Sequence, residues 1–232
     1  MAYAGTISMP DGTILHQWML TETAAELAQM CTAEALDATC EAKAESRRKE
    51  ILGERLLMKH IFGVPTPIMH DADRRPYLEQ SETHISVAHT KGYLVIALNP
   101  HHSMGVDVEQ YARRVLNVRD GFLNETEQQW LSPTDQLAHM IAWTAKEAIF
   151  KTIGERSRVS SYRNEIILHP FTTPTTAQTG NSQIKTGSNL TPTGSNLIHT
   201  GTFKNEQFHL HTILTPNHIL TFSTPKRYTK IT

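Results

Sequence analysis

The stretch from residue 84 to residue 109, HISVAHTKGYLVIALNPHHSMGVDVE, predicts three short strands separated by turns that contain Lys-Gly and Asn-Pro. Residues 84–89 alternate between apolar and polar side chains, as in a half-buried strand, and residues 93–98 are apolar enough for a central strand. Residues 104–109 are expected to form the third strand. Together the three strands predict a β-meander that packs on helices.

Helical patterns precede this stretch. Residues 22–62 are rich in Ala, Leu and Glu, contain no Pro and carry a single Gly. We therefore expect helix there, up to the break at Gly63-Val64-Pro65. Residues 70–80, HDADRRPYLEQ, are expected to form a polar loop.

The second half of the chain repeats the order of helix followed by strand. Asn124, with Glu127 three residues later, matches the capping-box pattern of a helix start. A further helix is predicted from Ser132-Pro133 to Lys151, and residues typical of strands return after Ser161. This order of elements predicts an α+β fold.

Residues 172–206 differ from the rest of the C-terminal half. Thr-Gly recurs there at positions 179, 186, 193 and 200, and TGSNL occurs twice. We expect a turn-rich or β-hairpin excursion, in part disordered, with no metal or phosphate chemistry of its own. A surface for contact with a partner is the less favoured alternative.

Composition limits the class of protein. The chain has 232 residues, a net charge of −1 and a pI near 6.9, which argues against a chain-wide nucleic-acid or membrane-surface binder. It has neither a basic leader nor an apolar run near the ~18 residues of a membrane span, so we expect a soluble cytoplasmic protein. Cys31 and Cys40 form no CxxC motif and are expected to be reduced thiols.

Two carboxylates lie two residues apart in the predicted strand GVDVE. Residues at i and i+2 of a strand face the same side, so Asp107 and Glu109 are expected to point together, between the apolar residues Val106 and Val108. Paired carboxylates are held by a cation or by positive neighbours, and Mg²⁺ commonly takes one or two of them. A solvent-facing strand edge is the alternative.

The helix sequence WTAKEAIFK, residues 143–151, brings a third carboxylate next to an ammonium group. At ~100° per residue, Trp143, Glu147 and Lys151 share one helix face. Glu147 and Lys151 are either an ordinary surface pair or groups that point at a metal-bound phosphate. Upstream, His89 and Thr90 at a strand end are either structural or able to bind phosphate.

The order and spacing of these motifs resemble the 4′-phosphopantetheinyl transferase superfamily, in particular its larger, surfactin-synthetase-activating type. GVDVE and WTAKEAIFK match the two hallmark motifs of that family at every defined position. Ala88-His89-Thr90 and Arg74-Arg75-Pro76-Tyr77 resemble its Ser-His-Ser strand end and its Gly-Lys-Pro loop, although Ala88 and Arg75 depart from those patterns. Residues 47–55 resemble its basic N-terminal helix.

The resemblance implies a reaction and roles for individual residues. Such enzymes transfer the phosphopantetheine arm of coenzyme A (CoA) to a serine of a carrier protein and release adenosine 3′,5′-bisphosphate. Asp107, Glu109 and Glu147 would hold Mg²⁺ or Mn²⁺, and Glu147 would also accept the serine proton. Lys151, assisted by Lys146, would neutralise charge on the leaving phosphate. The residues implied in binding the nucleotide and the phosphates of CoA are His89, Thr90, Arg75, Pro76 and one of Arg47, Arg48 or Arg55.

The resemblance also implies an architecture. We expect two pseudo-repeated α+β halves, residues 1–108 and 109–232, with the CoA cleft between them. A chain that holds both halves would act as a monomer, with CoA and an acyl or peptidyl carrier protein as its partners. A CoA or nucleotide sensor without transferase activity and a Mg²⁺-dependent phosphohydrolase or nuclease are the alternatives.

Overall fold

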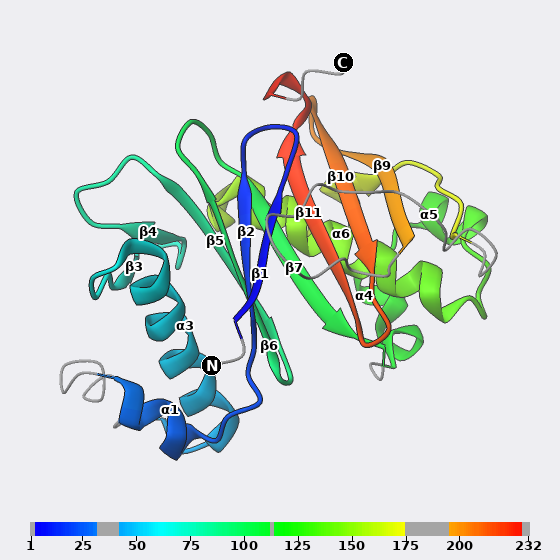
Figure 1. The fold of residues 1–232 in the computed structure, drawn as a ribbon. Coiled ribbons are helices and arrows are strands. Elements are labelled where there is room, and N and C mark those ends of the chain that lie inside the picture. The colour runs from blue at the N-terminus through cyan, green and yellow to red at the C-terminus, as the bar shows by residue number, and fades with distance from the viewer. Residues whose placement is uncertain (1–2, 32–41, 112–113, 175–194, 229–232) are drawn as a thin grey trace.

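Two antiparallel sheets pack against each other in the computed structural model, and one long helix covers the outer face of each sheet (Figure 1). The structure describes residues 3–31, 42–111, 114–174 and 195–228. The layers therefore run helix, sheet, sheet, helix, which confirms the predicted α+β fold.

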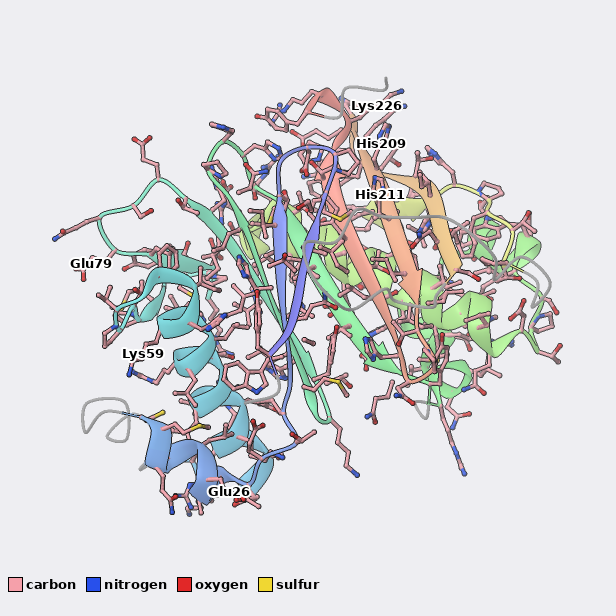
Figure 2. All side chains as sticks on the ribbon, viewed as in Figure 1. Glu26, Lys59, Glu79, His209, His211 and Lys226 are labelled. Carbon is pink, nitrogen blue, oxygen red and sulfur yellow. The ribbon has the colours of Figure 1, made fainter. Side chains whose placement is uncertain are left out.

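The first sheet has the strand order β1-β2-β6-β5. Its strands are β1 (Tyr3–Ser8), β2 (Ile14–Met19), β5 (His84–Thr90) and β6 (Tyr93–Asn99), and the helices beside it are α1 (Ala24–Met30) and α3 (Glu45–Phe62). Leucines of α3 share a buried core with Trp18 and Ile96 of the sheet. Lys59 lies on the exposed side of the same helix (Figure 2).

The second sheet has the strand order β7-β11-β10-β9-β8. Its strands are β7 (Gly105–Gln110), β8 (Ile166–Leu168), β9 (Ser195–Phe203), β10 (Glu206–Leu214) and β11 (His218–Pro225), and its covering helix is α6 (Gln136–Ile153). The side chain of Asp135 caps α6 by accepting a hydrogen bond from the Ala138 amide at 2.9 Å. The helix ends at Gly154, whose φ of +74° suits glycine.

Shorter elements connect these layers. A two-stranded sheet is formed by β3 (Ile68–His70) and β4 (Pro76–Leu78). The short helices are η1 (Val115–Val118), α4 (Arg119–Phe122), α5 (Glu125–Trp130), η2 (Arg156–Arg158), α7 (Tyr162–Glu165) and η4 (Lys226–Tyr228). The capping box predicted at Asn124 and Glu127 is confirmed at the start of α5.

Gly105 lets β7 lie directly against α6. A Cβ at this position would overlap the carbonyl oxygen of Ala148 and would lie 2.7 Å from the Thr152 nitrogen. Both obstacles are backbone atoms, so no rotamer change could relieve the overlap. The glycine of GVDVE is therefore required by the close approach of strand and helix that brings the two motifs together.

The predicted meander is wrong in one respect. β5 and β6 pair as expected, but β7 leaves their sheet and pairs with β11, for example Asp107 with Thr221. Buried Val106 and Val108 of β7 belong to the core between the two sheets, and this core decides the position of the strand. The domain boundary expected after residue 108 falls inside β7, whereas the change of sheet occurs between β6 and β7. The division into two pseudo-repeated halves stays a prediction.

The helices, loop, cysteines and Thr-Gly repeat expected from the sequence lie as follows in the structure. The helix expected over 22–62 consists of α1 and α3 where it is described, and residues 32–41, with Cys40, lie outside the described ranges. The expected loop 70–80 contains β4. Strands β1 and β2 were not predicted, because their sequences show no clear alternation of apolar and polar residues. Cys31 is a free thiol, as expected. Most of the Thr-Gly repeat lies outside the described residues, and its last copy, Thr200-Gly201, lies within β9.

Candidate active site

A cleft of about 250 Å³ lies where α3, the β3–β4 hairpin, β5 and the C-terminal half of α6 meet. Five of its lining residues are cationic and three are acidic, so it suits an anionic ligand. The cations are Arg47, Arg74, Arg75, Lys151 and Arg156, and the acids are Glu54, Asp73 and Glu147. The other lining residues are His70, Pro76, Ile85, Ser86, Val87, His89, Phe150 and Gly154.

Lys151 connects the two hallmark motifs at the floor of this cleft. Its Nζ lies 2.9 Å from Asp107 Oδ1 and donates to the Val106 carbonyl oxygen at 3.0 Å. The other carboxylate oxygen, Asp107 Oδ2, is buried and has no hydrogen-bond partner among the residues that the structure describes. An orphaned carboxylate oxygen is costly to bury, so this atom is a candidate contact for a cation or a hydrogen-bond donor.

Glu109 of β7 and Glu147 of α6 each accept a hydrogen bond from an aromatic side chain, and Glu147 lines the cleft whereas Asp107 and Glu109 are not among its lining residues. Trp143 Nε1 donates to Glu109 Oε1 at 3.0 Å, and the Tyr162 hydroxyl donates to Glu147 Oε1 at 3.1 Å. Since Asp107 and Glu109 both bond to side chains of α6, the two carboxylates share the helix-facing side of β7, as their spacing predicts.

These carboxylates fit a divalent cation in part. Mg²⁺ needs only one or two carboxylates, with water and phosphate to complete its shell, and Asp107 Oδ2 has no partner within the described part of the chain. Among the described residues, however, no three His, Cys, Asp or Glu side chains already form a group that could hold a metal ion. The ligand set Asp107, Glu109 and Glu147 stays a prediction.

On the opposite wall, α3 and β5 contribute a connected group of charges. Arg47 Nη1 lies 3.0 Å from Glu50 Oε2, and Glu50 Oε1 lies 3.4 Å from Nδ1 of His89. Burial lowers the pKa of His89, and the neighbouring Glu50 opposes that shift. Of the three arginines considered for the nucleotide phosphate, Arg47 is the one among the lining residues.

Glu54, one turn beyond Glu50, also lines the cleft. Burial raises the pKa of this carboxyl to about 7, and the negative charge of Glu50 adds to the rise, while Arg47 and Arg55 oppose it. A carboxyl group with a pKa near neutrality in a cationic cleft is a candidate for ligand contact. The sequence offered no motif that would have identified it.

Several predicted residues are not among those that line the cleft, and Lys146 points away from it. Lys146 is fully buried, its Nζ lies 2.7 Å from Glu127 Oε2, and both side chains are 0% exposed. Because Lys146 is one residue before Glu147, a helix rotation of about 100° turns it away from the cleft. Lys146 thus lies in a buried ion pair, a placement that does not support its predicted role at the phosphate, and that role stays a prediction. Thr90 is not among the lining residues, whereas Arg75, Pro76 and His89 are.

A second hollow, of about 410 Å³, lies beside the first and is largely aromatic. Its lining residues are Val118, Gly121, Phe122, Trp143, Glu147 and Tyr162. Glu147 lines both hollows, so one carboxylate stands between a cationic space and an aromatic space. The histidines of β10, His209 and His211, lie on the second sheet and are not among the residues that line either hollow (Figure 2).

Comparison with known proteins agrees with this geometry. The sequence profile described as "ACPS: 4′-phosphopantetheinyl transferase superfamily" matches residues 103–213, which include both motifs. Over these residues, slightly less than half of its length, the chain is similar to the 4′-phosphopantetheinyl transferase superfamily. It is 24% identical over 117 residues to the "4′-phosphopantetheinyl transferase gsp" of Aneurinibacillus migulanus. The match covers 46% of this chain and 48% of that relative, about half the length of each protein.

No helix within the described ranges has both the length and the apolar character that a bilayer-spanning segment needs.

Proposed function

We propose that this chain is a 4′-phosphopantetheinyl transferase, which transfers the 4′-phosphopantetheine group of CoA to a serine of an acyl or peptidyl carrier protein and releases adenosine 3′,5′-bisphosphate. The observation that carries the proposal is the position of Glu147, which lines both the cationic cleft and the aromatic hollow. The phosphates of CoA would lie in the cleft, and the carrier serine would approach through the hollow.

In phosphoryl transfer, the protein mainly positions the reacting groups and stabilises the charge of the transition state. The serine oxygen forms a bond to the phosphorus that carries pantetheine, and the bond from that phosphorus to the bridging oxygen of the pyrophosphate breaks. Glu147, held by the Tyr162 hydroxyl, would accept the serine proton. Lys151 would stabilise the negative charge that develops on the leaving adenosine bisphosphate.

A divalent cation belongs to the proposal. Asp107 and Glu109, with Glu147, would hold Mg²⁺ or Mn²⁺, and Asp107 would offer the buried oxygen that has no other partner. When bound, the cation would neutralise charge on the pyrophosphate. The proposal further includes a monomeric, cytoplasmic enzyme of the holo-acyl-carrier-protein synthase type that serves fatty-acid biosynthesis.

The test is the intact mass of an apo acyl carrier protein after incubation with this chain, CoA and Mg²⁺. We expect a gain of one phosphopantetheine group that disappears with EDTA, together with one adenosine 3′,5′-bisphosphate per modified carrier. CoA binding without mass gain on acyl and peptidyl carriers would favour a sensor. Hydrolysis of CoA without a carrier would favour a phosphohydrolase.

A further inference from the structure

Arg74 occupies a backbone conformation that glycine usually takes. Its φ is +62°, in the left-handed region that side chains with a Cβ rarely adopt. The turn around it is set by Asp71, whose carbonyl oxygen accepts from the Arg74 amide at 3.0 Å and whose Oδ1 accepts from the Arg75 amide at 2.8 Å. A glycine would make the same turn without strain. Strained residues are typical of functional sites, which indicates that the side chain of Arg74 has a function that a glycine could not supply.

That side chain lines the cation-rich cleft. Within the part of the chain that the structure describes, the Arg74 guanidinium makes no hydrogen bond and no ion pair. It is an exposed side chain at the rim, where its planar group is available to a ligand. A guanidinium binds phosphate in bidentate fashion, which suits this position.

Arg75, the next residue, contacts other protein side chains through its guanidinium. Arg75 Nη2 donates to Ser103 Oγ at 3.2 Å and lies 3.4 Å from His84 Nδ1. Ser103 in turn donates to the Thr152 carbonyl oxygen near the end of α6 at 2.7 Å. Burial, with the charge of Arg75, lowers the pKa of His84, which favours a neutral ring that can accept from the guanidinium.

The packing of Arg75 completes this tether. A Cβ added to Gly154 would lie 2.9 Å from Arg75 Cδ and Nε, so the arginine packs closely on the residue that ends α6. Arg75 therefore ties the β3–β4 hairpin to the second half of the molecule. Part of its hydrogen-bonding capacity is already taken by protein groups.

We propose that Arg74 supplies a phosphate-binding cation to the cleft, while the adjacent Arg75 acts chiefly as the tether that holds the hairpin in place. The inference rests on the proposed function for the identity of the ligand, CoA, whose phosphates would meet this side chain. It explains why the turn keeps a strained arginine where a glycine would be more stable.

The experiment compares Arg74→Gly with Lys204→Gly. Lys204 is a matched control: it is also a cation in the left-handed region, with φ +53°, but it lies in the β9–β10 turn and is not among the residues that line the cleft. Both substitutions remove one positive charge and relieve one strained residue. Calorimetric titration with CoA and thermal unfolding would be measured on each variant and on the unchanged chain.

We expect Arg74→Gly to bind CoA about 10-fold more weakly, as for the loss of a charged hydrogen bond, with a weaker salt dependence and a thermal midpoint that is unchanged or higher. Lys204→Gly should keep the affinity of the unchanged chain. Two results would overturn the proposal. One is a CoA affinity of Arg74→Gly within about 2-fold of that of the unchanged chain, and the other is weaker binding together with a lower thermal midpoint. Loss of a charged contact predicts a larger change in affinity without loss of stability.

Titration with inorganic pyrophosphate separates this inference from the proposed function. If the unchanged chain binds pyrophosphate but not CoA, and Arg74→Gly loses the pyrophosphate, the assignment of CoA fails and the role of Arg74 stands. If the unchanged chain binds CoA and Arg74→Gly binds it equally well, the role of Arg74 fails and the proposed function stands. If the unchanged chain binds neither compound, both are overturned.

Discussion

Lys151 Nζ and Asp107 Oδ1 lie 2.9 Å apart, and this ion pair joins the last turns of α6 to β7. It leaves Asp107 Oδ2 buried and without a partner among the described residues, and we propose this oxygen as a metal ligand. We predict that Asp107→Asn lowers phosphopantetheine transfer by about 100-fold or more, since loss of a metal ligand removes several kcal/mol of charge stabilisation. The mass assay measures transfer, and electron paramagnetic resonance of added Mn²⁺ measures binding independently.

The fold should survive that change. Asn has the same shape as Asp, and Lys151 keeps its bond to the Val106 carbonyl oxygen. A circular dichroism spectrum equal to that of the unchanged chain is the control. Retention of both Mn²⁺ binding and transfer in Asp107→Asn would contradict the metal assignment.

Tyr162 is expected to act through Glu147. Its hydroxyl donates to Glu147 Oε1 at 3.1 Å, so Tyr162→Phe should lower kcat by about 10-fold, the size of one hydrogen bond to a charged group. Glu147→Gln, which removes the proposed base itself, should abolish transfer. The KM for CoA in Tyr162→Phe should stay close to its original value, because Tyr162 is not among the residues that line the cationic cleft. Unchanged kcat in Tyr162→Phe would refute this coupling.

Lys146 is predicted to serve stability instead of ligand binding. Lys146→Met leaves the charge of Glu127 buried and unpaired, which should cost about 3–5 kcal/mol of unfolding free energy. Adding Glu127→Gln should recover part of this loss, because no unpaired charge then remains. Urea unfolding measures both effects. A CoA affinity that falls in the folded Lys146→Met protein would restore Lys146 to the list of ligand contacts.

Glu54 is predicted to make stability depend on pH. Because its pKa rises from 4.5 to about 7 on folding, the native state binds more protons than the unfolded state between those values. Its contribution to the free energy of unfolding must therefore fall as pH rises through that window. Glu54→Gln removes this contribution, so the variant should gain stability relative to the original chain at about pH 8 but not at about pH 5. Equal differences at the two values would show that Glu54 has an ordinary pKa.

Local sequence patterns were sufficient for much of the fold. The apolar alternation of β5, the capping box of α5 and the glycine that ends α3 act over a few residues, so the periodicity and the caps indicate them directly. The spacing of Asp107 and Glu109 on one strand, and of Trp143 and Lys151 on one helix, also placed them on shared faces, as their bonds between β7 and α6 show.

Other features depend on contacts between distant parts of the chain. β7 lies in the second sheet because Val106 and Val108 are buried between both sheets, and no local pattern records which neighbour a strand will pair with. Lys146 of α6 meets Glu127 of α5, 19 residues away in the chain, and both side chains are fully buried, which no local pattern indicates.

The cleft also combines features set by local sequence with features set by contacts between distant parts of the chain. The sequence by itself determined the residue types, their order and their helix or strand faces, because those follow from backbone geometry within one element. Only the tertiary structure decided that Arg47 reaches the cleft, that Arg75 is bonded to Ser103, and that Glu54 has a raised pKa. Burial and charge at a site are sums over neighbours from several elements, and these neighbours come together only when the sheets and helices pack.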